Sequence, residues 1–592
     1  MKSADSIPAI LRRVICILNA NEKRRSLFIL IGVFANSLID IFGLAFVVPV
    51  IGLVIRPETI EENVLINRAF IWSHSVGIES PKEFLVLLCG LMAGAFLFKA
   101  LFGLAITLIQ SRFAFSVAHR LSGKKWTHHF SQSLERIRST NSGNIIAEIS
   151  TWPMYFAQSF IVGSLMSLSE MIVVLIIAIA LLVYNFTVFA SIAILLVLGT
   201  LVIRLLTKKR LQDYSSIRKE LEPHSFALIN NSISGFLELI TFDAAKAIRE
   251  SFLKNQQSIF RVQSNTTALN YAPARLYEAL AVTAVAGSIF IALLQDTTQT
   301  SFLQLLTFMA ISAYRIMPSM SRINGIALQM RGQLHILEAM ESGGNPEVEE
   351  TPYKHVIAND DNDTAVHVNL VKFAAMYEAL TEPVLNNVNF CFAPGKIHGV
   401  IGPSGVGKST LIYSILGLHN HISGQIRISL GTNDFILGED LEPREWMQKL
   451  CYLSQKPFLF RGTLRENLTF GVPHLTLNEE LTLELIDRLE LTETLGKSPL
   501  DFQLHDGGNN LSGGQQQRIA LIRVLQLRRP LIILDEATSA LNSRLRDEVF
   551  ALLRQQSQLG ANVILVTHDS ELAGKCDDVL ALGQASSIRD DF

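Results

Sequence analysis

The chain has 592 residues and a formal net charge of −2, with 49% hydrophobic and 18% charged residues. This length predicts more than one domain, and the near-neutral charge excludes a global basic field for nucleic acid. Five scattered cysteines lack metal-ligand spacing and are interpreted as ordinary thiols. Long apolar runs fill residues 26–325, whereas the remainder has the composition of a soluble domain.

Six apolar segments are long enough to cross a membrane, because about 20 helical residues span its hydrocarbon core. They are predicted at residues 26–55, 84–110, 158–183, 186–206, 274–295 and 301–325, with a tight turn near Asn185. The first is too long for a signal peptide, so residues 26–330 are predicted to form a transmembrane domain. Lys and Arg cluster before the first segment and after the second and fourth. The positive-inside rule therefore places residues 1–25 and the C-terminus in the cytoplasm.

The two long polar loops, residues 111–157 and 207–270, are rich in helix formers and contain no low-complexity sequence. We predict that they extend the membrane helices into the cytoplasm. Their tips, near residues 140–145 and 225–234, are expected to dock on the soluble domain and transmit motion.

Four basic residues lie within or beside the apolar segments: Lys99, Arg275, Arg315 and Arg322. A charge inside a bilayer costs about 2.5–3.5 kcal/mol on insertion scales unless it faces water or a partner. We interpret the four as a cationic belt for a phosphate or pyrophosphate group, which guanidinium donors fit well. Two alternatives stay open: the arginines reach lipid headgroups, or Asp40, Glu170 and Glu278 neutralise the cations in structural ion pairs.

Residues 331–365 are predicted to be a linker, and alternating strands and helices predict an α/β nucleotide-binding domain over residues 366–592. A glycine-rich turn lies between a strand pattern at 398–401 and a helix pattern at 411–416. It consists of Gly402, Pro403, Ser404, Gly405, Val406, Gly407, Lys408, Ser409 and Thr410. In this context the turn is typical of a phosphate-binding loop, whose backbone N–H groups surround nucleotide phosphates. Lys408 would reach the β- and γ-phosphates, and Ser409 would bind Mg²⁺.

Further motifs follow in the order that nucleotide hydrolysis needs. Tyr377 precedes the loop and is placed to stack on adenine; the alternative is an ordinary strand aromatic. Gln455 follows a predicted strand and could contact Mg²⁺ or the attacking water. A second anion-binding helix start is predicted at Ser512, Gly513, Gly514 and Gln515.

Two buried strands are predicted to end in polar side chains. The first, residues 531–534, leads into Asp535, which suits the Mg²⁺ shell, and Glu536, which suits polarising water for in-line attack. The second, residues 563–567, leads into His568, which could contact the γ-phosphate.

Together these motifs resemble the ATP-binding-cassette (ABC) ATPase domain, and six membrane segments ahead of one cassette resemble MsbA- and PglK-like (type IV) half-transporters of the ABC exporter group. The resemblance implies ATP and Mg²⁺ as cofactors, a homodimer, and catalysis by Glu536 with Gln455 and His568. It also implies that each ATP lies between the phosphate loop of one subunit and Ser512 and Gly514 of the other. Asn542 departs from the family, which usually has Asp at this position.

A narrower resemblance is to the PglK-type flippases, and it rests on residues 38–42 leading to Val48 and Pro49, on residues 274–278, and on residues 314–318 through Arg322. In that group, basic residues at positions matching the belt engage a pyrophosphate. The resemblance implies an ATP-driven flippase for a lipid-linked (polyprenyl-pyrophosphate) oligosaccharide, or a similar anionic lipid, in the bacterial inner membrane. Two other functions stay open: export of a peptide or amphipathic drug, and regulation of a partner without transport.

Overall fold

The computed structural model describes residues 7–55, 64–74, 80–131, 136–137, 140–184, 186–294, 299–342, 365–377, 382–419, 422–441, 443–470 and 476–583. In parts of the long helices, Arg315 and Asp40 included, it describes the backbone alone. The chain divides into two compact units, a helical unit that runs to Pro346 and an α/β unit that follows. Each unit is described by itself.

Six long helices make up most of the helical unit: α2 (Ala20–Ile55), α5 (Pro81–Phe130), α9 (Gly163–Tyr184), α10 (Phe186–Ser234), α12 (Ala245–Leu294) and α13 (Gln299–Gly332). Each overlaps one of the predicted apolar segments, the third of which begins in the π-helical stretch before α9. Within the described part of the chain, Pro81–Phe130 and the helical run Ser142–Ile179 are long and apolar enough to cross a membrane. The count of six membrane spans stays a prediction, and the turn at Asn185 lies outside the described residues.

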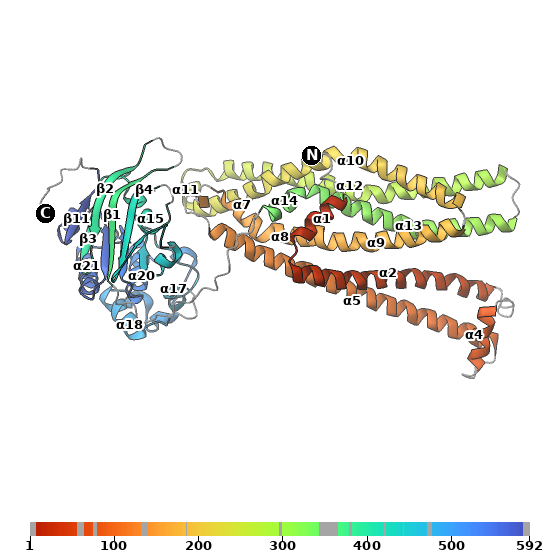
Figure 1. Ribbon diagram of the computed structural model, residues 1–592, viewed down its shortest axis with the longest axis horizontal. Coiled ribbons are helices and arrows are strands. Elements are labelled where there is room, and N and C mark those ends of the chain that lie inside the picture. The colour runs from red at the N-terminus through yellow and green to blue at the C-terminus, as the bar shows by residue number, and fades with distance from the viewer. Residues whose placement is uncertain are drawn as a thin grey trace. The chain divides into compact units, whose positions relative to one another are not determined.

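The long helices pack lengthwise: α2 lies against α5, α9 against α13, and α12 against both α10 and α13 (Figure 1). Helix α5 begins in a capping box, in which the Ser80 hydroxyl accepts from the backbone N–H of Glu83. Helices also occupy most of the two long polar loops, because α5, α10 and α12 continue well beyond their apolar segments.

Shorter helices complete the helical unit: α1 (Ile7–Ile17), α4 (Val64–His74), α7 (Ser142–Ile146), α8 (Trp152–Phe156), α11 (Phe236–Thr241) and α14 (Leu334–Glu341). Two π-helical stretches, η1 (Ala147–Thr151) and η2 (Ala157–Val162), connect α7 through α8 to α9. The sequence predicts a linker where α14 lies. The structure instead buries Ile336 and Leu337 of this helix in one core with Trp152 and Phe156, because its apolar residues recur at helical spacing.

The α/β unit contains a parallel sheet in the order β11-β3-β10-β9-β6, an antiparallel sheet in the order β2-β1-β4-β5, and the short pair β7-β8. Its strands are β1 (Val366–Ala375), β2 (Leu385–Phe392), β3 (Ile397–Ile401), β4 (Ile422–Leu430), β5 (Asn433–Ile436), β6 (Leu450–Leu453), β7 (Gly462–Thr463), β8 (Gln503–Leu504), β9 (Leu531–Asp535), β10 (Asn562–Val566) and β11 (Asp578–Ala581). Every residue of β9 and β10 is buried, as expected for parallel strands covered on both faces.

Alternate residues of β9 and β10 belong to two apolar cores, so the parallel sheet separates these cores, and helices cover it. They are α15 (Lys408–Ile415), α16 (Pro443–Met447), α17 (Leu464–Leu468), α18 (Glu479–Arg488), α19 (Thr492–Leu495), α20 (Gly513–Gln526), α21 (Ser543–Gln558) and α22 (Ser570–Gly574), with 3₁₀ turns η4 (Pro499–Asp501) and η5 (Asp506–Gly508). Residues of α15 pack in the core that also holds the antiparallel sheet. Residues of α20 and α21 pack in the other core.

Candidate nucleotide-binding site

The predicted catalytic residues lie at one edge of the parallel sheet. Strand β10 lies between β3 and β9, and Val566 at its end pairs with Val400 on one side and Asp535 on the other. Because parallel strands end at the same edge, the loop after β3, the carboxylates after β9 and the imidazole after β10 all lie there. Ligands of open α/β sheets bind at this edge.

The glycine-rich loop requires glycine at two positions. Gly405 and Gly407 have φ angles of 81° and 103°, in the left-handed region that side chains disfavour. A Cβ on Gly407 would also lie 2.9 Å from a side-chain carbon of Val384. The turn brings the chain directly into α15, whose first residues are Lys408 and Ser409. Its backbone N–H groups at this helix start are the expected phosphate donors.

Lys408 is buried beneath the loop, and its ammonium donates to the carbonyl oxygens of Gly402 at 2.7 Å and Pro403 at 3.0 Å. Ser409 lies beside it and is exposed. The Tyr377 hydroxyl is 3.1 Å from the Thr410 hydroxyl, so this ring lies next to the first turn of α15. The structure therefore places the predicted adenine residue beside the predicted phosphate loop.

Glu536 is held between two other predicted residues. Its Oε2 accepts from Nε2 of Gln455 at 2.5 Å, and its Oε1 lies 2.5 Å from Nε2 of His568. Glu536 also has a left-handed φ of 50°, and its backbone N–H donates to the carbonyl of Val566 at 3.0 Å. This backbone geometry is unusual for a residue with a side chain, and it turns the carboxylate out of the strand.

Asp535, the last residue of β9, is buried. Burial and then the charge of Glu536 raise the pKa of its carboxyl, while the hydroxyl of Tyr452 at 3.4 Å and the charges of Lys408 and His568 oppose the rise. The loop lysine and the two carboxylates therefore influence one another electrostatically. A cation bound here would favour the ionised carboxylate.

The second predicted helix start is also present. Ser512 caps α20 in a capping box: its hydroxyl accepts from the backbone N–H of Gln515, and the Gln515 side chain accepts from the backbone N–H of Ser512. Ser512 and Gly513 are exposed and Gly514 is half-buried. Within the described residues, no hydrogen bond or ion pair joins this helix start to the glycine-rich loop. One chain therefore presents two predicted phosphate-binding elements that no described hydrogen bond or ion pair joins.

Two residues that support the site are absent from the sequence predictions. Gln517 on α20 contacts the backbone oxygen of Gln455 and the hydroxyl of Ser539, each at 3.4 Å. Arg523 is buried, donates to the backbone oxygen of Asn467 at 2.8 Å, and lies 3.9 Å from the Phe470 ring centre. Burial lowers the pKa of Arg523 to about 10. The signal in the sequence is the position of Arg523 inside the apolar run 519–525 of α20.

The basic belt of the helical unit is distributed over three helices. Lys99 on α5 lies 5.3 Å from the Phe96 ring centre. Arg275 on α12 pairs with Glu278 at 3.2 Å, and both side chains are mostly exposed. The side chains of Arg315 and Asp40 lie outside the described residues.

Arg322 on α13 pairs with Glu170 on α9 at 2.6 Å. Two of the ion pairs considered from the sequence are therefore present. Within the described residues, no hydrogen bond or ion pair joins one belt residue to another.

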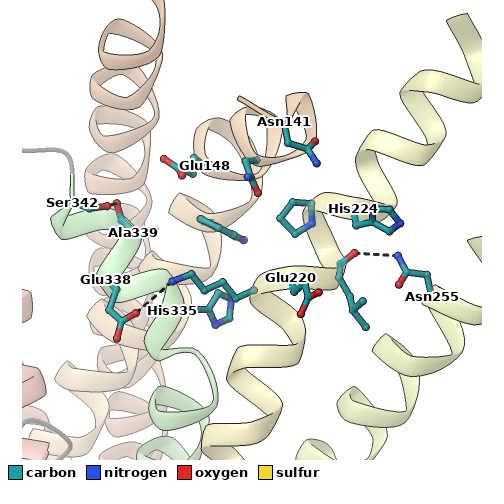
Figure 2. Close-up of a pocket in the computed structure, with 14 residues that line it drawn as sticks. Asn141, Glu148, Glu220, His224, Asn255, His335, Glu338, Ala339 and Ser342 are labelled. Atoms are coloured by element: carbon teal, nitrogen blue, oxygen red, sulfur yellow. Dashed lines mark hydrogen bonds and ion pairs between the residues drawn. The ribbon is translucent and has the colours of Figure 1, made fainter. Parts of the chain in front are cut away.

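A cavity of about 760 Å³ lies elsewhere in the helical unit, among α7, α10, α12 and α14. Figure 2 shows His335, Glu338 and Asn255 around it, and Lys219 pairs with Glu338 at 3.9 Å. Its lining carries more acidic than basic side chains and includes none of the four belt residues. It is therefore a poor match for a phosphate group.

Part of the α/β unit matches a known family model. Residues 385–539 match the family model described as ABC transporter. This segment is therefore similar to the domain that ABC transporters share. The matched range contains the glycine-rich loop, Gln455, Ser512, Asp535 and Glu536, whereas Tyr377 and His568 lie outside it.

Curated relatives match over part of the chain. "Multidrug resistance-like ATP-binding protein MdlA" of Escherichia coli is 34% identical over 219 residues, which is 36% of this chain and 35% of that protein. An "ATP-dependent lipid A-core flippase" of Xylella fastidiosa is 31% identical over 221 residues, 36% of each protein. The chain thus spans about a third of the length of these relatives.

A solved structure is similar over almost the whole chain. It is a bacterial Atm1-family ABC exporter with ATP bound, matched over 96% of this chain and 94% of that one, with a TM-score of 0.71 and 18% identity. The likeness establishes the fold, a helical domain followed by an α/β ATPase domain. The predicted exporter fold is confirmed at this level.

Proposed function

We propose that the chain is one half of an ATP-driven exporter that works as a homodimer in the bacterial inner membrane. Its substrate is a polyprenyl-pyrophosphate-linked oligosaccharide or a similar anionic lipid, carried through six membrane spans. The observation that carries the ATPase part is the position of Glu536, held by Gln455 and His568 at the sheet edge that also carries the phosphate loop.

The residues at this edge fit ATP and Mg²⁺. The N-terminus of α15 and the ammonium of Lys408 suit phosphate, and Ser409, Asp535 and Gln455 supply the oxygen ligands that Mg²⁺ prefers. Within the described residues, no three His, Cys, Asp or Glu side chains form a metal site. Phosphate and water oxygens would therefore complete the magnesium shell. Bound Mg²⁺ would neutralise charge on the transferred phosphate.

Glu536 acts on the attacking water. Its carboxylate orients the water and takes its proton while the γ-phosphate is transferred. Gln455 and His568 hold the carboxylate on both oxygens, so its direction is fixed before the water arrives. The side chains of Gln455 and His568 also carry polar groups that can turn toward the nucleotide.

The dimer follows from the two phosphate-binding elements. Ser512 and Gly513 expose the start of α20, with Gly514 and Gln515 behind them, and nothing described in the same chain joins this start to the loop. A second copy of the chain would supply the missing half of each ATP site. The two ATP sites of the dimer would then close together when ATP binds. This closure would open the substrate path between the membrane helices to the outer side of the membrane.

The substrate class rests on the belt residues Lys99, Arg275, Arg315 and Arg322. A cation on a membrane helix has a high free energy unless it faces water or an anion. Guanidinium groups are well suited to bind a pyrophosphate. The relatives named for a lipid flippase and for multidrug resistance match over similar lengths of this chain, 36% each, so their names do not select a substrate. The choice of substrate therefore depends on the helical unit.

The test is lipid flipping in proteoliposomes that contain the full-length chain and a polyprenyl-pyrophosphate oligosaccharide. Replacing Lys99, Arg315 and Arg322 by Ala should abolish flipping. Arg120→Ala, which removes an arginine of the same unit paired with Glu22, is the matched control and should retain it. Undiminished flipping by the triple variant would refute the belt, and stimulation of ATP turnover by peptides or drugs alone would favour the rival exporter.

ATP turnover without movement of any lipid, peptide or drug would favour the third possibility, a regulator of a partner protein. A direct comparison with Glu536→Gln separates these cases. An exporter loses flipping and hydrolysis together in this variant.

A further inference from the structure

Glu170 on α9 forms a polar cluster with two residues of α13. Its Oε1 lies 2.6 Å from Nε of Arg322, and its Oε2 accepts from the hydroxyl of Ser319 at 2.6 Å. Ser319 is fully buried, and the Glu170 side chain is 14% exposed, whereas that of Arg322 is 41% exposed. A buried hydroxyl therefore fixes the carboxylate, and the carboxylate holds an arginine whose side chain reaches the surface.

Two other arginines of the helical unit are held differently. Arg13 donates to Glu341 through Nε and Nη2 at 2.8 and 2.5 Å, and Arg120 donates to Glu22 through the same two nitrogens at 2.7 and 2.9 Å. Such a contact uses the fork that a guanidinium presents to phosphate. The nearest contact of Arg322 to its carboxylate is through Nε, and among the described residues its terminal amino groups donate no hydrogen bond.

We propose that Glu170 is a positioning residue, which holds Arg322 by Nε so that the terminal amino groups of this arginine bind a phosphate oxygen of the substrate. The inference rests on the proposed function and deepens it. Glu170 also neutralises the guanidinium when no substrate is bound, which lowers the cost of keeping a cation between apolar helices. Ser319 fixes Glu170 in turn.

This arrangement has a measurable consequence for affinity. An arginine already held in its binding orientation loses less conformational freedom when the ligand binds. Releasing it should weaken binding by about 3- to 10-fold, the usual effect of having to order one rotamer-rich side chain. The effect must vanish when Arg322 is absent, because Glu170 acts only through it.

The experiment measures binding of radiolabelled farnesyl pyrophosphate to the full-length chain in detergent without ATP. Glu170→Gln is tested alone and combined with Arg322→Ala, which makes a double-mutant cycle. Glu22→Gln is the matched control, because Glu22 pairs with an arginine of the same unit and is also 14% exposed. Ser319→Ala is a milder variant that keeps both charges and should weaken binding by about 2- to 4-fold.

The expected result is that Glu170→Gln weakens binding in the wild-type background and changes it less than about 2-fold in the Arg322→Ala background. Equal weakening in both backgrounds would assign Glu170 to helix packing and overturn the proposal. Tighter binding by Glu170→Gln would overturn it as well, because Glu170 would then compete with the substrate. If the wild-type chain binds no farnesyl pyrophosphate, the proposed function itself fails.

Discussion

The two units hold their functional charges in different ways. In the α/β unit, Glu536 contacts Gln455 and His568, and all three follow strands of one parallel sheet. In the helical unit, the belt residues lie on separate long helices, and Arg275 is 84% exposed. A site at the ends of parallel strands is fixed by short sequence motifs, whereas a site on long helices depends on how the helices pack and on what they bind.

The largest expected effect tests the strand-end site. Glu536→Gln removes the base but keeps an amide that can contact Gln455 and His568. ATP hydrolysis should fall by about 100-fold or more, because general-base catalysis contributes at least that factor. Phosphate release measures hydrolysis, and binding of a fluorescent ATP analogue should remain near wild type. Hydrolysis at the wild-type rate would show that the contacts around Glu536 are structural.

The second effect concerns the support behind that site. Arg523→Leu leaves the backbone oxygens of Asn467 and Phe458 without their buried donor. The α/β unit should lose about 2–4 kcal/mol of unfolding free energy, since buried polar groups left unpaired are costly. Urea unfolding followed by the fluorescence of Trp446, the tryptophan of this unit, measures it once the other three are replaced by Phe. Arg544→Leu, at an exposed ion pair, is the control and should unfold like the wild type.

The contrast also explains what the sequence could predict. The loop from Gly402 to Thr410, the Asp535–Glu536 pair and His568 each end a strand, so order along the chain was enough to bring them together. The exporter fold, a helical domain followed by an α/β ATPase domain, is confirmed. These features depend on residues that are close together in the sequence, so a short motif is enough to predict them.

The partners of Arg523 and Arg322 could not be assigned from the sequence, because they depend on packing between distant segments. Glu170 is more than a hundred residues from Arg322, and several carboxylates were equally available to it. The sequence predicts a linker where helix α14 lies, because the helical spacing of its apolar residues does not show which core receives them. The partners of these arginines and the position of α14 are determined by tertiary packing.

The third effect uses a buried histidine of the helical unit as a probe of its packing. Burial, with the charges of Arg218 and Lys219, lowers the pKa of His335 from 6.5 to about 3. Between about pH 3 and pH 6.5, His335 is therefore protonated in the unfolded chain but not in the folded one. Its contribution to the unfolding free energy is fully present above pH 6.5 and is lost as the pH falls. Lowering the pH from 7 to 5 should cost the helical unit about 2 kcal/mol through this residue.

Thermal unfolding of the detergent-solubilised chain at pH 7 and pH 5 tests this step. His335→Phe keeps an aromatic ring next to Trp152 and cannot be protonated, so the loss on acidification should shrink. His119→Phe, on an exposed position of α5, should leave it unchanged. An unaltered loss in His335→Phe would mean that this histidine is not held neutral by burial.

The smallest effect returns to the strand-end site, at the residue that departs from the family pattern. Asn542 caps α21, and its side-chain oxygen accepts from the backbone N–H of Leu545 at 2.8 Å. Asp caps a helix as well as Asn does, so Asn542→Asp should change stability by less than about 0.5 kcal/mol, whereas Asn542→Ala should cost about 1 kcal/mol. Chemical unfolding measures both. Because the cap is retained, any change in ATP turnover by Asn542→Asp comes from the added charge. A loss of stability equal to that of Asn542→Ala would instead show that the carboxylate does not cap the helix.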